Sequence, residues 1–371
     1  MPATDPMAGA AKRRDRSVKE GGETEMKPRV LYILERYPQL SETYILNEVE
    51  NVREKYDIEI FTLRQAPLPY ENHQPYHLAD GKTEEVLDNL RELFRPDIVH
   101  FHYIHIARMF LPFCQHYGIP FTVRMHSFDA LRNIGGGRQR NIESLARYAD
   151  MVNSELCLGV LSFPCTIDNL VAAGMRREKL LPSFPVVNVA AFFDRAPNGG
   201  DILNVGAALG KKAMGDFMRL AKLVPDLTFN LYAIGYNIDD LRAENAQTGG
   251  RCNIFDAVQP EEMPRIYKRH RWLVYTASIV SRNVGWPMAV AEAQAAGVGV
   301  CIANVRPDLK DYLGPGGGIL FDDVSELTDI LHQEVPEEMR ERGFEQCWKS
   351  DISKNILQLT NLWDSLEVRA A

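Results

Sequence analysis

The sequence predicts an α/β protein built from two doubly wound halves, each a parallel β-sheet with helices on both faces. Two observations support this prediction. Short apolar runs rich in β-branched and aromatic residues alternate with helical segments, and the alternation starts again after a Pro- and Gly-rich segment at 191–200. The 371 residues are enough for two hydrophobic cores. Two such halves enclose a cleft, and ligands bind there, outside the carboxyl ends of the strands.

The first half is predicted from the spacing of apolar residues between Arg29 and about residue 187. Tyr44, Ile45, Val49 and Val52 have helical spacing, and Gly118 follows the third helix as a C-cap. The predicted strands are 30–34, 58–63, 98–101 and 121–123, and the predicted helices are 42–52, 83–94 and 107–117. Segments 152–154 and 166–174 continue the pattern, whereas 135–138 is interpreted as a flexible basic loop that either covers the acceptor side or has no function.

The second half repeats the pattern after the linker. Its predicted strands are 202–205, 227–234, 253–255, 272–276 and 298–303, and its predicted helices are 215–224, 260–269 and 288–296. A last helix near 352–366 follows the completed second half, so we expect it to return to the first. The predicted organisation is a disordered tail (1–26), an N-terminal domain (27–190), a linker (191–200), a C-terminal domain (201–350) and a returning C-terminal helix (351–371).

Composition excludes several classes of protein. A net charge of −8 disfavours nucleic-acid binding, which normally requires a basic face. We find no apolar run of the roughly 18–20 residues that a membrane span needs, and residues 1–26 lack the apolar core of a secretory signal. The six scattered cysteines are expected to be free thiols. We therefore expect a cytoplasmic protein.

The segment from Gly285 to Gly297 is the strongest candidate for a functional site. A Gly-x-Pro turn leads from a strand into a helix, whose first amides are free to face an anion. Glu292 lies about one turn into that helix, where its carboxylate can accept hydrogen bonds from ribose hydroxyls. An ordinary strand-to-helix crossover remains the alternative on these grounds alone.

This segment resembles the donor-binding motif of the family 4 glycosyltransferases of GT-B fold, E-G-x-P-x-x-x-x-E-A-x-A-x-G-x-P-V. Gly285, Pro287, Glu292 and Gly297 match the motif, as do the alanines at 293 and 295. The resemblance implies a GT-B fold of two Rossmann-like domains. It also implies that the turn's amides hold the donor diphosphate and that Glu292 binds the ribose.

Other segments extend the resemblance over residues 28–366, towards a branch associated with polysaccharide biosynthesis. Tyr37–Ile45 is similar to its F-P-x-x-S-E-T-F-I opening, and 99–102 and 121–129 are similar to its V-H-x-H and F-x-x-H-x-x-D segments. The resemblance implies a catalytic role for His126, and a donor site made of Gly206, Lys212, Gly285, Trp286, Pro287, Met288 and Glu292. It also implies an acceptor side made of Ser41, Glu42, Thr43 and Asp129.

Three positions depart from the family pattern. Val284 replaces a carboxylate that holds donor-sugar hydroxyls, Ala207 replaces an arginine of the diphosphate site, and Ala213 replaces a glycine. Losing a charge-assisted contact to phosphate costs about 1.5–3 kcal/mol. We expect Arg282, two residues before Val284, to supply the missing contact to the diphosphate or the donor sugar.

The resemblance implies a retaining hexosyltransferase that moves a sugar from a nucleotide-diphosphate donor to a hydroxyl of a glycan, a lipid-linked saccharide or a small molecule. No cofactor, metal or nucleic acid is expected, and peripheral contact with the inner membrane face remains open. A weakly active or inactive homologue that acts as a partner subunit is the alternative, because of the three departures. An epimerase of the same fold would need a water-activating carboxylate that we do not locate. A zinc site at His100, His102 and His105 is disfavoured, because the sequence places no carboxylate or cysteine near them at ligand spacing.

Overall fold

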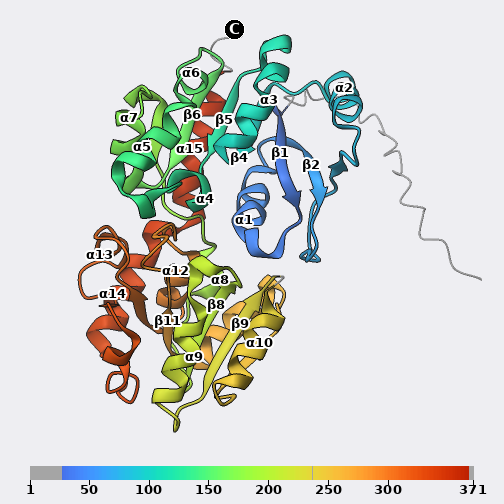
Figure 1. Cartoon of the computed structure of the whole chain (residues 1–371). Coiled ribbons are helices and arrows are strands. Elements are labelled where there is room, and N and C mark those ends of the chain that lie inside the picture. Colours follow the sequence, from blue (N-terminus) through green and yellow to red (C-terminus); the bar gives the residue numbers. More distant parts are fainter. Residues whose placement is uncertain (1–26, 236, 367–371) are drawn as a thin grey trace, which may run out of the picture.

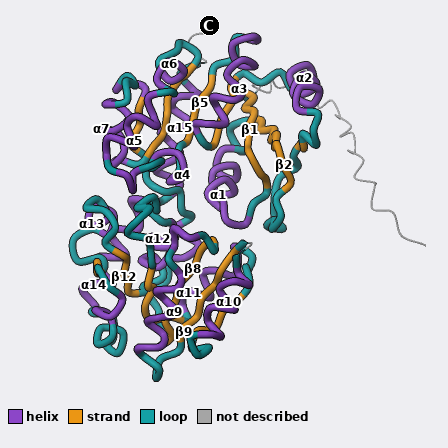
Figure 2. The backbone as a smooth tube through the Cα atoms, viewed as in Figure 1, coloured by secondary structure: helices purple, strands orange, loops and turns teal. Residues whose placement is uncertain are grey.

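The computed structural model describes residues 27–235 and 237–366, and the predicted disordered tail therefore lies outside the described residues. The chain forms two lobes, each centred on a parallel sheet (Figure 1). The helices surround the strands in both lobes (Figure 2). In the part of the chain that is described, no helix has the length and apolar character needed to cross a membrane.

The upper lobe in Figure 1 contains a seven-stranded sheet in the order β3-β2-β1-β4-β5-β6-β7. Its strands are β1 (Arg29–Tyr37), β2 (Asp57–Gln65), β3 (His77–Leu78), β4 (Ile98–His102), β5 (Phe121–Arg124), β6 (Cys157–Ser162) and β7 (Leu180–Pro182). All paired strands run parallel, and 30–34 of β1 is buried throughout because helices cover both faces. The strand order reverses between β1 and β4, so a ligand site is expected where these two strands end.

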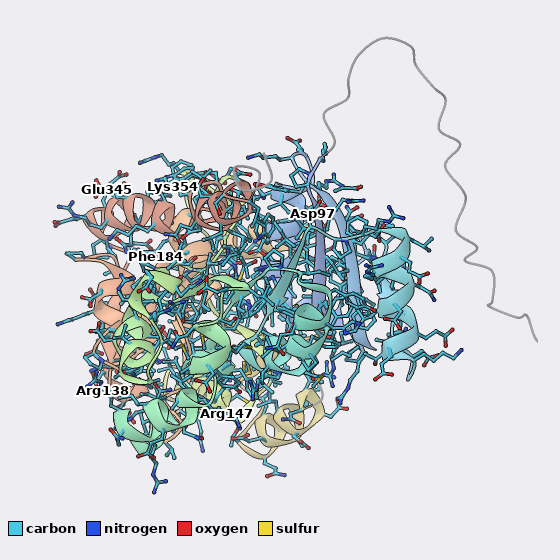
Figure 3. The ribbon with its side chains drawn as sticks, turned by 90° about the horizontal axis from the view of Figure 1, so that it is seen from above. Asp97, Arg138, Arg147, Phe184, Glu345 and Lys354 are labelled. Atoms are coloured by element: carbon cyan, nitrogen blue, oxygen red, sulfur yellow. The ribbon has the colours of Figure 1, made fainter. Side chains whose placement is uncertain are left out.

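The helices of this lobe are α1 (Thr43–Val52), α2 (Thr83–Leu93), α3 (Ile104–Tyr117), α4 (Ser127–Ala130), α5 (Arg138–Ala146), α6 (Ala149–Val152) and α7 (Ile167–Ala172). Gly118 ends α3 in the left-handed conformation, as predicted for a C-cap. Arg29 and Asp97 form an ion pair at the amino-terminal edge of the sheet. Figure 3 views the molecule from above this edge, with Asp97 labelled, so the carboxyl ends of the strands point away from the viewer towards the second lobe.

The lower lobe contains a six-stranded parallel sheet in the order β10-β9-β8-β11-β12-β13. Its strands are β8 (Asp201–Ala207), β9 (Phe229–Ile234), β10 (Cys252–Phe255), β11 (His270–Tyr275), β12 (Gly299–Ala303) and β13 (Ile319–Phe321). Its helices are α9 (Met214–Leu223), α10 (Ile238–Gln247), α11 (Met263–Lys268), α12 (Met288–Ala295), α13 (Leu309–Leu313) and α14 (Glu337–Cys347). Here the order reverses between β8 and β11, which places the loops after these strands at the second expected ligand site.

The last helix, α15 (Ile352–Asp364), returns to the first lobe, as predicted. It packs on α1 and β6 and lies among the elements of the upper lobe in Figure 1. The indole of Trp363 is fully buried there and donates a hydrogen bond to Thr122 Oγ1 of β5 at 3.0 Å. Asp364 pairs with Lys55, just beyond the end of α1. The C-terminal helix is therefore part of the core of the N-terminal lobe.

Three local predictions differ from the structure. Segment 152–154 lies at the end of α6, and the strand begins at Cys157, because the apolar residues at 151–152 pack as a helical turn instead. The segment 191–200 begins inside a short helix, α8 (Val189–Phe192). The predicted loop at 135–138 is a 3₁₀ turn that leads directly into α5.

Candidate functional site

A cavity of about 1280 Å³ lies between the carboxyl ends of the two sheets. Pockets for drug-sized ligands span about 300–1,000 Å³, so this one is large enough for a nucleotide sugar together with part of a second substrate. It brings together most of the residues singled out from the sequence. Its lining includes Ser41, Glu42, Thr43, His126, Gly206, Lys212, Gly285, Trp286, Pro287, Met288 and Glu292.

The turn before α12 contributes backbone donors to this cavity. Pro287 is the N-cap in an extended conformation, and α12 begins at Met288. The amides of Met288 and Ala289 have no carbonyl one turn before them within the helix, and both residues line the cavity. The amino terminus of α12 therefore presents partial positive charge to the cavity, as expected from the sequence.

A steric constraint that the sequence did not reveal explains why position 285 is a glycine. Its backbone is not in the left-handed region, so its conformation does not demand glycine. A Cβ atom at this position would lie 2.9 Å from Ser127 Cβ and 3.0 Å from Phe163 of the N-terminal lobe. Gly285 therefore lets the two lobes approach each other.

Trp286 contributes mainly to the junction between the lobes. Its ring stacks on Tyr312 at 5.0 Å between centroids and contacts Phe184 at 5.2 Å, and its Nε1 donates to Asp308 at 2.8 Å. Phe184, labelled in Figure 3, belongs to the segment that follows β7. The indole is thus fixed by packing and by a hydrogen bond, and it holds the turn before α12 against both lobes.

Glu292 lies on the cavity wall and is held by Tyr267, whose hydroxyl donates to Glu292 Oε2 at 2.7 Å. Burial raises the pKa of Glu292 to about 7, although the hydrogen bond from Tyr267 acts in the opposite direction. One carboxylate oxygen is therefore oriented by the protein. The other, Oε1, has no hydrogen-bond partner among the described residues and can accept hydroxyl protons from a ligand.

Lys212 follows β8 and lines the same cavity. Burial and, to a smaller extent, the charge of the adjacent Lys211 together lower the pKa of its ammonium group to about 7. Nζ lies 4.2 Å from the centre of the Tyr275 ring and 3.5 Å from the point where a Cβ of Gly206 would be. No carboxylate among the described residues forms an ion pair with it. Cations buried in this way usually pair with an anion.

Lys211 lines the cavity beside it and extends to the other lobe. Its Nζ donates to Ser127 Oγ at 3.2 Å, and burial lowers the pKa of its ammonium group. The residue was named from the sequence only as a neighbour of Lys212.

Two predicted residues do not lie on the cavity wall. Arg282 is exposed in the left-handed conformation, and its Nε donates to the carbonyl of Ile279, so the structure does not place it where the sequence suggested. The cation that contacts Val284 is instead Arg306. Its side chain is buried, pairs with Asp308 and donates to the carbonyl of Val284.

Asp129 lies behind His126 and is also absent from the wall. Its carboxylate accepts from the backbone N–H groups of His126 and Ile104, both at 2.7 Å. Burial raises the pKa of Asp129 to about 6, although these hydrogen bonds oppose the effect. Asp129 is therefore a positioning residue for the backbone that carries His126, and not a residue that contacts an acceptor.

His126 connects the cavity to a buried polar network. Its Nε2 lies 2.9 Å from His102 Nδ1, and His102 Nε2 lies 3.2 Å from Glu48 Oε1. Because Glu48 can only accept when ionised, the chain of hydrogen bonds is consistent when His102 donates to Glu48 and His126 donates to His102. Burial, reinforced by His102, lowers the pKa of His126 well below its ordinary value. His126 is therefore held as a neutral imidazole.

Glu48 is the centre of this network. It is fully buried on α1 and accepts from Arg124, Tyr32 and His102, with His100 Nε2 at 2.9 Å. Burial alone would raise the pKa of Glu48, but Arg124 and the two imidazoles lower it well below its ordinary value. The sequence interpretation that no carboxylate lies near these histidines is corrected here.

This network has the composition of a metal site, since Glu48, His100 and His102 offer ligand atoms within 4.8 Å of one another. However, the Arg124 guanidinium already neutralises the carboxylate, and a metal ion would have to compete with it. His105, the third histidine of the sequence hypothesis, faces Glu35 instead at 3.7 Å. The cluster therefore fits a role in fixing His102 and His126 better than a role in binding a cation.

Two tyrosines and a glutamate, Tyr44, Tyr103 and Glu42, form the wall on the other side of His126. The ring of Tyr44 stacks on His126 at 4.1 Å, and its hydroxyl lies 2.6 Å from that of Tyr103. Tyr103 donates to Glu42 at 2.7 Å. Burial raises the pKa of Glu42, against these hydrogen bonds. Tyr103 has φ of 75°, an uncommon conformation for a bulky residue that is typical of functional sites.

Several of these residues were missed in the sequence. Glu48 falls between Ile45 and Val49 on the apolar stripe of α1, and a carboxylate in a core position was a detectable signal. The sequence around Tyr103 and Tyr267 gives no such signal, because an isolated tyrosine next to a strand or in a helix is common in any core.

No protein-family model and no curated protein sequence matches the chain. Solved structures do match. Anabaena Alr3699/HepE in complex with UDP has 11% identity and a TM-score of 0.69 over 91% of this chain and all of its own. Sucrose-phosphate synthase from Thermosynechococcus elongatus has 13% identity and a TM-score of 0.68, with 92% and 100% coverage. WaaG, a glycosyltransferase involved in lipopolysaccharide biosynthesis, has 12% identity and a TM-score of 0.61, with 90% and 99% coverage. Together with the two facing parallel sheets, these similarities show that the chain has the GT-B fold of glycosyltransferases.

Proposed function

We propose that this protein is a nucleotide-sugar-dependent glycosyltransferase whose donor binds in the cavity between the lobes. The observation that carries the proposal is Lys212, a partly buried ammonium group without an acidic partner among the described residues, in the same cavity as the free amides of α12. A diphosphate would satisfy both, since helix termini and buried cations each favour an anion.

The rest of a nucleotide sugar fits the neighbouring residues. Glu292 has a free carboxylate oxygen for ribose hydroxyls, and Tyr267 fixes its orientation. The cavity continues towards Tyr232, Ile234 and Val258, which offer an apolar surface for a base. HepE, which shares the fold, has been crystallised with UDP and with UDP-glucose, which supports this class of donor.

The acceptor is expected on the N-terminal side of the cavity. Glu42 can accept a hydrogen bond from a sugar hydroxyl, and Tyr103 keeps its carboxylate in place. Phe128 is 55% exposed and lines the cavity nearby, so an apolar sugar face can pack against it. We therefore favour a glycan or lipid-linked saccharide over a small apolar acceptor.

Three finer features belong to the proposal, two of them through the resemblance of 285–297 to family 4. These two are transfer with retention of configuration and neutralisation of the leaving diphosphate by Lys212 and α12 without a metal ion. The third feature, action in the cytoplasm or at the inner face of the membrane, is proposed from the composition and from the segment at 37–45 instead. His126 would lie beside the donor sugar as a neutral imidazole. Closing of the lobes would exclude water from the reacting carbon.

A thermal-shift screen tests the proposal. UDP-, GDP-, ADP- and dTDP-sugars are added separately to the full chain, and a bound donor at a hundred times its dissociation constant stabilises the fold by about 2.7 kcal/mol. We expect one of them to raise the unfolding temperature. No shift with any donor would contradict the proposal and favour the inactive-partner alternative.

A further inference from the structure

Lys211 is a second cation in the cavity, and it differs from Lys212 in what it contacts. Among the described residues, its ammonium group donates one side-chain hydrogen bond, to Ser127 Oγ at 3.2 Å, across the gap between the lobes. Burial lowers the pKa of this ammonium group, and within 27–235 and 237–366 no carboxylate pairs with it. A single hydroxyl leaves most of the ammonium's hydrogen-bonding capacity unused.

The two lysines also repel each other, and no carboxylate in the described part of the chain offsets this repulsion. Lys211 lowers the pKa of Lys212, and both side chains line the same cavity. Two adjacent, partly desolvated cations are costly unless an anion lies between or beside them. A solvated surface pair would instead extend into water, as Lys222 does on α9.

The position of Ser127 means that the side chain of Lys211 connects the two lobes. Ser127 begins α4 of the N-terminal lobe and lies against Gly285 of the C-terminal lobe, where the two lobes approach each other closely. The backbone N–H of Ser278, in the loop after β11, donates to the carbonyl of Lys211 at 2.9 Å. The side chain of Lys211 thus leaves a fixed backbone and ends at the opposite lobe.

We infer that Lys211 is the second cationic ligand of the diphosphate, and that its contact with Ser127 ties the bound diphosphate to the N-terminal lobe. This inference rests on the proposed function. It replaces the expected contribution of Arg282 with that of a residue on the cavity wall. The ligand class it specifies is a diphosphate, because two adjacent cations and the α12 terminus offer separate contacts for two phosphate groups.

Calorimetric titration tests the inference with the nucleoside diphosphate of the donor that gives the largest thermal shift and with the corresponding nucleoside. In Lys211→Met we expect diphosphate affinity to fall about ten- to a hundredfold, the size of a lost charge-assisted contact, with nucleoside affinity unchanged. Lys211→Arg should recover most of the loss. Lys222→Met is the matched control, and it should bind like the wild type.

Three results would overturn the inference. They are wild-type diphosphate affinity in Lys211→Met, an equal loss for nucleoside and diphosphate, and an equal loss in Lys222→Met. Ser127→Ala tests the link between the lobes. We expect a smaller loss than in Lys211→Met and no further loss in the double variant, whereas additive losses would show that the two residues act independently.

Failure of this inference can be told apart from failure of the proposed function. If the wild type binds a nucleoside diphosphate and Lys211→Met binds it equally well, only the role of Lys211 is wrong. If the wild type binds no nucleotide, the proposed function fails. Titration of inorganic pyrophosphate into the wild type and Lys211→Met then shows whether the anion site exists without a nucleotide site.

Discussion

Charged residues buried in the cavity account for most of what the site can do. Lys212 and Glu292 both line the cavity, and burial moves the pKa of each towards 7 from opposite directions. A diphosphate favours the ammonium form of Lys212, and ribose hydroxyls favour the carboxylate form of Glu292. The affinity of the donor therefore depends on the protonation of both.

The first prediction concerns this dependence on pH. Below the pKa of about 7 Lys212 is already charged, so its contribution to affinity is complete there and declines, by up to tenfold per pH unit, above pH 7. The contribution of Glu292 to affinity changes with pH in the opposite direction, because its carboxylate becomes protonated as the pH falls below about 7. Titration of the nucleoside diphosphate from pH 5.5 to 9 should show maximal affinity near pH 7.

Variants separate the two limbs of that profile. Lys212→Met should remove the alkaline decline, and Glu292→Gln should remove the acidic one. Persistence of the alkaline decline in Lys212→Met would assign it to another group.

Elements were more predictable than the contacts between them. Buried strands such as β1 and β8 are short apolar runs, and the amphipathic helices α1, α2 and α9 show their spacing in the sequence. The polar helices α10 and α14 were missed, since α10 buries no residue and leaves no apolar stripe. The turn of α12 was predicted from its sequence. Its packing on Ser127 depends on the other lobe and leaves no local trace.

The network around Glu48 joins α1, β4, β5 and, through Thr122 and His100, the returning helix α15. We expect Glu48→Gln to destabilise the fold by about 3–5 kcal/mol, because it leaves the Arg124 guanidinium buried without its counter-charge. Urea unfolding of the full chain measures the change. Glu54→Gln, an exposed change just after the same helix, should alter it by less than about 0.5 kcal/mol. A loss below about 1 kcal/mol for Glu48→Gln would show that the network is not essential to the lobe.

At the scale of the whole molecule, the approach of the two lobes is part of the site. The cavity is lined from both sides, and Lys211, Gly285 and Trp286 all contact the N-terminal lobe. The GT-B fold was predictable from the repeated strand and helix pattern together with the motif at 285–297. The residues that join the lobes were not, because each contact pairs side chains far apart in the sequence.

Gly285→Ala tests the importance of this approach. The added Cβ would meet Ser127 Cβ at 2.9 Å, and overpacking of this kind costs about 1–3 kcal/mol, so we expect a lower midpoint of thermal unfolding. Gly210→Ala is the control, because its Cβ meets nothing within 4 Å. Ser127→Gly should restore part of the loss in Gly285→Ala. Equal effects of the two alanine variants would show that the contact between the lobes is not tight.

The central claim is that the cavity between the lobes binds the diphosphate and ribose of a nucleotide sugar. Calorimetric titration of the nucleoside diphosphate into the wild type, Lys212→Met and Glu292→Gln tests it most directly. The account predicts one site in the wild type and at least about tenfold weaker binding in each variant, as expected for a lost hydrogen bond to a charged group. Wild-type affinity in both variants, or no binding to the wild type, would contradict it.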